Sequence, residues 1–289
     1  MATTTTAVAP PLTRIPQKQL SSRLAELPWW AALILLAAVL LIYNFATSAT
    51  YNEILTTLAE GIRLTILVTL TAYSFAVTLG LLTALGQLSS NVVIKNAATL
   101  YVQIVRGVPI LVQIFYTAFV IVPGAIVALN ALGARLAAAG WLGSDNPLVS
   151  LNVRDVDFVA RGIIALAISY GAFSSEIFRA GIQSIERGQV EAGQALGLNR
   201  FQSLRLVILP QAVRRVLPPL GNDFIAMLKE SSLVSVIGVG EVTQLAKKYA
   251  AASFLYPETY NTLAFLYLSM TLVLSMGVRF MERRLKTRL

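Results

Sequence analysis

Few side chains of this chain could carry out covalent or redox chemistry, because the sequence contains neither histidine nor cysteine. Disulfides, thiolate nucleophiles, imidazole metal sites and histidine-based proton relays are therefore excluded. The GxxxxGK(S/T) pattern of a phosphate-binding loop is absent, as are HExxH and GxSxG. We therefore expect no catalytic residue, no metal and no cofactor in this chain, which argues against an intramembrane hydrolase.

Four ionisable residues lie in strongly apolar surroundings: Arg106, Glu176, Lys229 and Glu230. A charge within a membrane span costs a few kcal/mol on insertion scales, and it usually faces a helix bundle or an aqueous pathway. Arg106 either extends to the membrane surface along its apolar stem or faces such a pathway. For Glu176, an ion pair with Arg179 three residues later competes with recognition of a substrate ammonium group.

The sequence MLKESSLVS, residues 227–235, interrupts an apolar helix with two charges and several hydroxyls. Free backbone groups of a broken membrane helix must be satisfied by protein or by a water-lined cavity. With Ser231 or Ser232 as cap, a second half-helix would direct its positive N-terminal dipole at a substrate carboxylate, whereas a simple kink is the alternative. The candidate substrate pathway comprises Arg106, Glu176, Lys229, Glu230, Ser231 and Ser232.

Membrane helices must position these residues, because the composition is that of an integral membrane protein. Of the 289 residues, 56% are hydrophobic and only 13% are charged, whereas about 25% of a soluble domain is charged. Runs of about 20 apolar residues are long enough to cross a hydrocarbon core about 30 Å thick. The uncharged runs are Leu27–Asn52, Leu64–Ile94, Gly107–Ala134 and Thr259–Val278.

We therefore expect an all-α polytopic membrane protein with about six transmembrane helices. The fifth helix is expected to be broken, and residues 123–160 are expected to form an excursion outside the membrane with a short helix at 125–139. The predicted helices are 29–46, 62–88, 100–122, 162–180, 216–227 with 233–245, and 262–280.

The distribution of basic residues predicts the orientation. With six spans, residues 1–28, 87–98, 179–215 and 279–289 share one side and carry 15 of the 23 lysines and arginines, against 6 on the other side. Because basic loops are normally cytoplasmic, both termini, with tails 1–28 and 285–289, are expected inside and the excursion in the periplasm. The net charge of +9 follows from this bias and from anionic lipid, and it requires no nucleic acid.

The longest expected cytoplasmic segment, residues 182–215, has enough polar content to form a docking surface. Helical periodicity stops at Gly197 and resumes with Asn199 as N-cap, and Pro210 marks the return to the bilayer. Gly197 provides either a left-handed turn or room for close approach of a partner backbone. Two short protruding helices are therefore expected.

Within this segment, EAGQALGLNRFQSLRLVILP resembles the EAA loop of permease subunits of ATP-binding-cassette importers. Gly193 and Val207 depart from the EAA pattern, each with a small or apolar replacement. The resemblance implies that this loop couples the permease to an ATPase. The residues assigned to coupling are Glu191, Ala192, Gly193, Gly197, Leu209 and Pro210.

Segments 101–116, 168–185 and 217–247 are similar to permeases of polar amino-acid importers of the histidine/glutamate/glutamine type. Over residues 51–284 the resemblance implies a five-helix core, to which helix 29–48 is an addition. It implies alternating-access import of polar L-amino acids across a bacterial inner membrane. The implied partners are two ATPase subunits that bind ATP and magnesium, a second permease copy or paralogue, and a periplasmic amino-acid-binding protein.

A secondary amino-acid transporter driven by an ion gradient is the alternative. It would need no ATPase, but it predicts inverted repeats and buried acids in symmetric positions. The sequence contains neither feature.

Overall fold

The computed structural model describes residues 29–286, so the predicted tail 1–28 and residues 287–289 lie outside the described range. No β-strand occurs in the described part, which agrees with the all-α class. The chain divides into two units, of which the first contributes α2 (Trp29–Thr47) and the second begins at Ser48. The predicted first helix is confirmed by α2.

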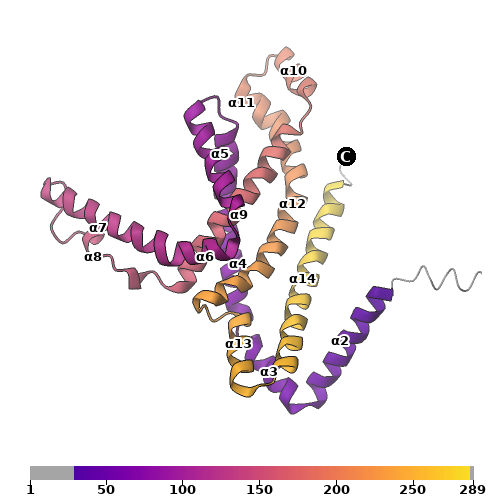
Figure 1. Cartoon of the computed structure of the whole chain (residues 1–289). Coiled ribbons are helices and arrows are strands. Elements are labelled where there is room, and N and C mark those ends of the chain that lie inside the picture. Colours follow the sequence, from indigo (N-terminus) through magenta and orange to yellow (C-terminus); the bar gives the residue numbers. More distant parts are fainter. Residues whose placement is uncertain (1–28, 287–289) are drawn as a thin grey trace, which may run out of the picture. The chain divides into compact units, whose positions relative to one another are not determined.

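The second unit consists of α-helices joined by short 3-10 and π segments (Figure 1). In chain order its elements are α3 (Ala49–Ala59), α4 (Ile62–Gln87), α5 (Val92–Gly107), α6 (Ile110–Tyr116), the π segment η1 (Thr117–Ile121), α7 (Val122–Ala138), α8 (Pro147–Ser150), the 3-10 turn η2 (Val153–Asp155), α9 (Phe158–Gln183), α10 (Arg187–Ala195), α11 (Arg200–Ser203), the π segment η3 (Leu204–Ile208), α12 (Leu209–Glu230), the 3-10 segment η4 (Ser231–Ile237), α13 (Val242–Ser253) and α14 (Tyr256–Lys286).

Several helices are long and apolar enough to cross a membrane, which supports a multi-pass membrane protein. The apolar part of α2, Ala32–Thr47, falls short of that length. α12 is strongly amphipathic and carries several charges, and it does not meet the same criterion. The number of six spans therefore stays a prediction. The stretches that qualify among the described residues are Ala49–Gln87, Ile110–Ala138, Phe158–Gln183 and Tyr256–Arg284.

α4 and α9 pack closely through small residues at the centre of the second unit. A Cβ added to Gly80 of α4 would lie 2.8 Å from the Ser174 Cβ and 3.0 Å from the Gly171 carbonyl oxygen of α9. Such close backbone approach is typical of helix pairs in membranes. Gly171 and Ser174 therefore contribute to this helix packing. Buried apolar residues around it include Val68, Ala72, Ile114, Leu166 and Met227.

The predicted single helix 100–122 is wrong, because α5 ends at Gly107 and α6 begins only at Ile110. A proline forces the preceding residue towards extended backbone. Val108, which precedes Pro109, accordingly has φ −109° and ψ 134°. The chain is therefore broken at 108–109, well before the expected end of this span.

Gln113 satisfies the backbone carbonyls that this break leaves free. Its Nε2 donates to the carbonyl oxygens of Val105 and Val108, each at 2.7 Å. The Ser169 hydroxyl of α9 donates to Gln113 Oε1 at 2.7 Å and so fixes the amide orientation. Because free carbonyls in a membrane must find donors within the protein, this side chain makes the break a stable feature.

The expected helix end before residue 123 is also wrong, since the helix that begins at Ile110 continues to Ala138. Proline normally interrupts a helix because it lacks an N–H. Here the turn before Pro123 is a wider π-helix, in which Val122 N–H bonds to the Thr117 carbonyl oxygen. The segment 125–139 is therefore a continuation of the preceding helix and not a separate one.

Arg161 of α9 supplies the donor that Pro123 lacks. In the π register the Ala118 carbonyl would pair with residue 123, and Arg161 NH1 donates to that carbonyl at 3.0 Å instead. Its other nitrogens donate to the carbonyl oxygens of Val156 at 2.8 Å and Val153 at 2.5 Å. The nearly buried guanidinium thereby connects the helix α6–α7 to the chain before α9.

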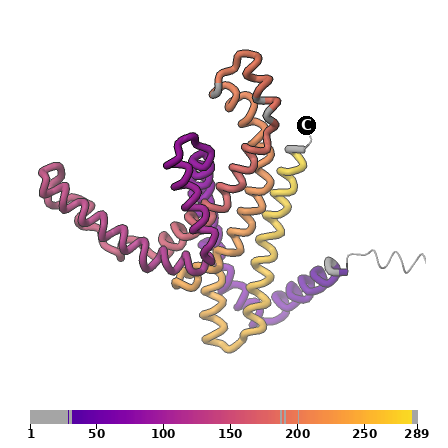
Figure 2. Tube along the Cα trace, turned by 45° about the horizontal axis from the view of Figure 1, so that its top comes forward, coloured from indigo at the N-terminus to yellow at the C-terminus, as the bar shows by residue number. Residues whose placement is uncertain are grey.

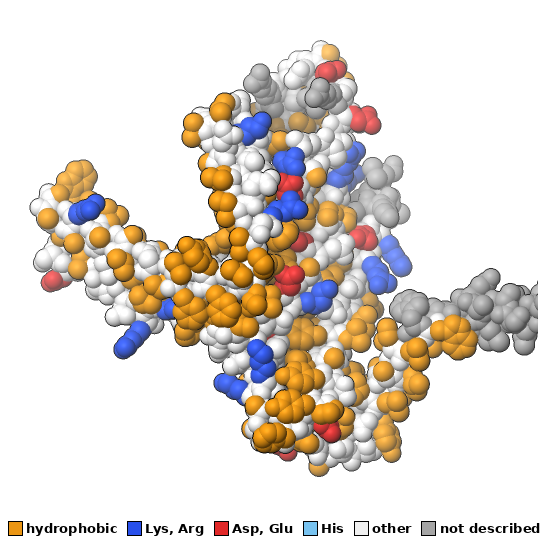
Figure 3. All heavy atoms as spheres, in the orientation of Figure 1, with side chains coloured by type: hydrophobic (Ala, Val, Ile, Leu, Met, Phe, Trp, Pro, Cys, Tyr) orange, Lys and Arg blue, Asp and Glu red, His pale blue; other side chains and the backbone are white. Residues whose placement is uncertain are grey.

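α7 and the segment after it form an arm that points away from the other helices of the second unit (Figures 1 and 2). The segment folds back along α7, where Asn146 Nδ2 donates to the Gly133 carbonyl at 3.3 Å and Asn130 Nδ2 to the Leu151 carbonyl at 3.1 Å. Hydrophobic side chains gather over α6 and α7 (Figure 3). This surface suits contact with lipid.

α12 begins at Leu209, earlier than the predicted start of helix five at 216. A π segment again precedes a proline, with Leu209 N–H bonded to the Leu204 carbonyl before Pro210. The wider turn allows the helix to continue through the proline. From Arg200 onward, α11, η3 and α12 therefore form one continuous helical element.

The expected half-helix N-terminus at Ser231 and Ser232 is wrong. These residues lie in η4, a 3-10 continuation of α12, and the Ser231 hydroxyl donates backwards to the Leu228 carbonyl at 2.7 Å. The chain turns at Gly238, and the second half of the broken helix begins only at Val242. No helix dipole therefore starts at the two serines.

Glu241 caps the second half-helix and is fully buried. Its two oxygens accept hydrogen bonds from Gln244 N–H and from the Tyr267 hydroxyl of α14, each at 2.9 Å. Gly61, before α4, allows this turn to approach, because a Cβ there would lie 2.6 Å from Val242 N. The cap therefore joins α4, α13 and α14.

α14 lies beside α12 (Figures 1 and 2) and extends beyond the predicted helix 262–280 at both ends. Gly221 of α12 makes room for it, since a Cβ there would meet Val278 at 2.9 Å. Residues 285–286, expected in a tail, belong to this helix.

Candidate functional site

The predicted docking segment forms two short helices that project beyond the ends of α5 and α14 (Figure 1). After α10 the chain turns at Gly197, which has φ +85°. Leu198 N–H bonds to the Gly193 carbonyl at 3.1 Å and Gly197 N–H to the Gln194 carbonyl at 2.9 Å. These paired bonds are a Schellman cap. Of the two alternatives for Gly197, the left-handed turn is the one that the structure contains.

The second short helix begins with a reciprocal cap. Asn199 Oδ1 accepts from Gln202 N–H, and Gln202 Oε1 accepts from Asn199 N–H, each at 2.9 Å. The predicted N-cap at Asn199 is therefore confirmed. Leu209 and Pro210 follow at the start of α12, where the segment joins this long helix.

The two departures from the EAA pattern lie against each other. Gly193 is buried, and a Cβ there would be 3.3 Å from Leu198 Cδ1 and 3.5 Å from Val207 Cγ2. A larger residue at 193 would be tight against Leu198 and in ordinary contact with Val207. Both replacements preserve the packing between the two short helices.

The tip of the segment is open to a partner. Glu191, Ala192 and Gly197 are exposed, and Leu196 is 85% exposed. Phe201 is also exposed. Exposed apolar side chains next to polar ones are typical of protein-docking surfaces.

The segment is tied directly to the membrane helices. Gln211 Nε2 of α12 donates to Gln189 Oε1 of α10 at 2.5 Å. The Arg215 guanidinium donates to the Ser184 carbonyl at the end of α9. A displacement of α10 would therefore act on α12 directly and on α9 through α12.

A cluster of charges lies where α5 meets α9. Glu176 Oε2 accepts from Arg179 at 2.5 Å, which confirms the i to i+3 pair. Arg106, in the last turn of α5, approaches the same oxygen at 3.9 Å and is 47% exposed. Its guanidinium also lies 5.7 Å from the centre of the Phe173 ring. One carboxylate thus faces two guanidiniums, and the cluster carries an excess positive charge.

A second, acidic cluster lies between α9 and α12. The Ser174 hydroxyl donates to Asp223 Oδ2 at 3.0 Å. Glu230, two turns after Asp223, interacts with it and with the Tyr170 hydroxyl. One carboxylate oxygen of Glu230 is buried and has no hydrogen-bond partner within the described part of the chain. A cationic group would find two acidic side chains here.

Asp223 was not among the candidate residues predicted from the sequence. The spacing could have identified it, because Asp223 precedes Glu230 by seven residues in one helix, which places both carboxylates on the same helix face. Lys229 is exposed, and it lies on a different face of α12 from Asp223 and Glu230. Arg106 and Glu176 are brought together, whereas Ser231 is bonded to its own helix.

The sequence and the fold match known membrane components of transport systems. The family described as "Binding-protein-dependent transport system inner membrane component" matches residues 76–288. The glutamine transport system permease protein GlnP of Escherichia coli (strain K12) is 33% identical over 229 residues, 79% of this chain and 93% of that protein. The L-cystine transport system permease protein TcyB of Bacillus subtilis (strain 168) is 34% identical over 229 residues, 79% of this chain and 86% of that protein.

A solved structure has a similar fold. The crystal structure of an amino acid ABC transporter with histidines aligns with a TM-score of 0.65 and 34% identity, covering 83% of this chain and 98% of the other.

Proposed function

The chain belongs to the family of binding-protein-dependent transport system inner membrane components and is a permease subunit of an ATP-binding-cassette importer, and we propose that it imports polar L-amino acids. The family supports this function over an ion-gradient-driven transporter. The amino-acid substrate class is supported by the names of the similar permeases, which act on glutamine and cystine.

We propose that α10 and the turn at Gly197 form the coupling element, seated in a groove of an ATPase subunit. The single observation that carries this proposal is the exposed Schellman turn, which presents Glu191, Ala192 and Leu196 outward while its inner face is packed. The hydrogen bond from α12 to α10 and the hydrogen bond from α12 to the end of α9 provide a path from the ATPase to the membrane helices. Leu209 and Pro210 would act as the joint between them.

The proposed assembly contains two ATPase subunits that bind ATP and magnesium, a second permease copy or paralogue, and a periplasmic amino-acid-binding protein. In this arrangement the nucleotide and its metal belong to the ATPase, and the permease provides the pathway by alternating access. Both termini would be cytoplasmic, as the distribution of lysine and arginine predicts. The arm at 123–160 would then lie towards the periplasmic half of the membrane.

We propose that the two charge clusters form the substrate pathway. A zwitterion loses hydration at both ends on entering the membrane, so it needs an acceptor for its ammonium group and a donor for its carboxylate. Glu230 and Asp223 provide the acceptors, and the exposed guanidinium of Arg106 beside Glu176 provides the donor. Lys229, exposed on α12, is a second candidate donor.

Uptake into proteoliposomes tests the energy source. With the full transporter reconstituted, uptake of labelled glutamine should require ATP on the ATPase side and should persist when proton and sodium gradients are collapsed. Uptake driven by an ion gradient without ATP would contradict the proposed function.

Competition by unlabelled amino acids tests the pathway. Glu230→Gln removes a charge from the acidic cluster, and we expect it to change the ranking of basic, neutral and acidic competitors while basal ATP hydrolysis persists. Glu258→Gln, at the start of α14, is the matched control and should leave the ranking unchanged. An unchanged ranking in Glu230→Gln, together with reduced thermal stability, would assign Glu230 a structural role only.

A further inference from the structure

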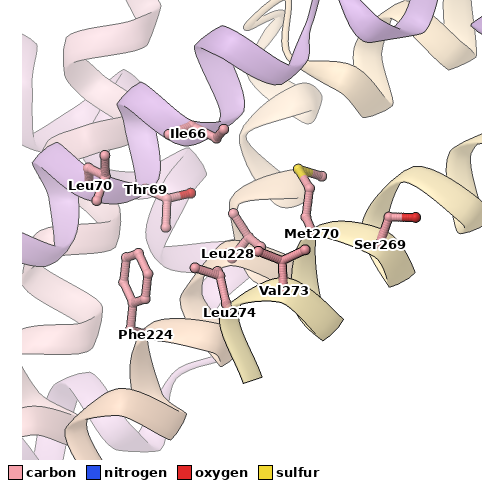
Figure 4. A pocket seen from close by; sticks show the side chains of 9 residues that line it. All are labelled: Ile66, Thr69, Leu70, Phe224, Leu228, Ser269, Met270, Val273 and Leu274. Atoms are coloured by element: carbon pink, nitrogen blue, oxygen red, sulfur yellow. The ribbon is translucent and has the colours of Figure 1, made fainter. Parts of the chain in front are cut away.

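An apolar cavity of about 430 Å³ lies between α4, α12 and α14 (Figure 4). Ile66 and Leu70 of α4 and Phe224 of α12 line it on one side, and Met270 and Val273 of α14 line it on the other. Val273 is 69% exposed, so the cavity opens to the surroundings of the helix bundle. No charged residue lines it.

The cavity offers no free hydrogen-bond donor to a polar ligand. Its two lining hydroxyls are both bonded within their own helices, Thr69 to the Thr65 carbonyl at 2.7 Å and Ser269 to the Phe265 carbonyl at 2.8 Å. The carboxylate of an amino acid placed here would lose its hydration without compensation. The cavity is therefore no part of the substrate pathway, and it suits a hydrocarbon group.

A basic side chain lies on the same face of α14 as the cavity. Met270, Val273, Gly277, Phe280 and Arg284 follow one another at steps of three and four residues, which places them along one helix face. Gly277 leaves this face open, because a Cβ there would meet no atom within 4 Å. The Arg284 guanidinium lies over the Phe280 ring, 5.2 Å from its centre.

The spacing along this face matches one leaflet of a membrane. Residues 270–274 lie 10 to 14 positions before Arg284, which is about 15–21 Å at 1.5 Å per residue. Half of a hydrocarbon core about 30 Å thick is about 15 Å deep. When the guanidinium is at headgroup level, the cavity is therefore at the depth of acyl-chain ends.

We propose that this face of α14 binds one phospholipid with an anionic headgroup, its acyl chain in the cavity and its headgroup at Arg284. Three features select this occupant: an opening towards the membrane, an apolar lining without charges or free hydrogen-bond donors, and a cation one leaflet away. The site goes beyond the import function and gives the permease a structural lipid between α4 and α14. The bound chain would fill the space that the two helices leave between them.

Lipid retention tests the site on the assembled transporter, purified in mild detergent from membranes containing phosphatidylglycerol and phosphatidylcholine. Arg284→Gln should lower the preference for phosphatidylglycerol about fivefold, the effect of one basic side chain near an anionic surface. Arg279→Gln removes the same charge from a different face of α14 and should leave the preference unchanged. Equal lipid retention in both variants would contradict the headgroup assignment.

A probe within the cavity tests the acyl chain directly. Because the chain contains no cysteine, Val273→Cys can carry a single fluorophore, with Leu272→Cys, exposed on another face of α14, as control. Phosphatidylglycerol with brominated acyl chains should quench the probe at 273 more strongly than brominated phosphatidylcholine does. At position 272 the two brominated lipids should quench the probe equally. Equal quenching at 273 would overturn the proposal.

A second permease copy could instead cover the cavity. In that case Val273→Cys would form a disulfide or a short cross-link between two permeases, and the probe at 273 would be protected from both lipids. That result would also overturn the lipid site, while leaving ATP-dependent uptake unaffected.

Discussion

Gly197→Arg should uncouple the permease from its ATPase without unfolding it. Gly197 has φ +85°, and a Cβ there would meet no atom of this chain within 4 Å. A substituted side chain therefore clashes with nothing in the permease, and it costs only the strain of a left-handed residue, about 1 kcal/mol. The new guanidinium would instead meet whatever partner approaches the turn.

The expected loss of ATPase binding follows from the contact between this guanidinium and the partner. Left-handed strain of about 1 kcal/mol shifts the local equilibrium of the turn about fivefold, which is too little to unfold the helix bundle. An arginine buried without a counter-charge at a subunit contact costs about 3 kcal/mol. That cost corresponds to a loss of about 100-fold in the docked complex.

The assay is ATP hydrolysis stimulated by substrate-loaded binding protein, measured in nanodiscs beside thermal unfolding. Gly197→Asn separates the two effects, because asparagine tolerates the left-handed turn and adds only a short side chain. Gly140→Arg is the matched control, since Gly140 has φ +74° and similarly open surroundings on the arm. Normal stimulation in Gly197→Arg would remove the turn from the coupling role.

Two further predictions concern the buried polar contacts that hold the broken and bent helices. Arg161→Leu leaves three carbonyls without their donor, so it should destabilise the arm by about 3 kcal/mol or more and expose it to limited proteolysis, whereas Arg154→Leu, at an exposed position, should not. Gln113→Leu leaves two carbonyls unpaired and should cost about 2 kcal/mol or more in thermal unfolding, with the exposed Gln103→Leu as control. Wild-type stability in either buried variant would contradict the assigned hydrogen bonds.

Much of the candidate site was predictable because it depends on neighbours in the sequence. The turn at Gly197, the cap at Asn199 and the pair of Glu176 with Arg179 all form within a few residues. Such contacts follow from residue type and helical spacing alone. The convergence of Arg106 on Glu176, and of Ser174 on Asp223, joins different helices and was not predictable from either segment.

The amino-acid sequence alone determined the all-helical membrane class, because long uncharged apolar runs are stable only where lipid surrounds them. It also determined the approximate position of most helices. The prolines led to wrong helix boundaries: Pro123 and Pro210 predicted helix ends at positions where the helices continue. At Pro123 only the tertiary structure decided the outcome, because the donor that replaces the missing N–H of Pro123 is the Arg161 guanidinium of another helix. A helix tolerates a proline when a partner distant in sequence satisfies the freed carbonyl, and no local pattern records that partner.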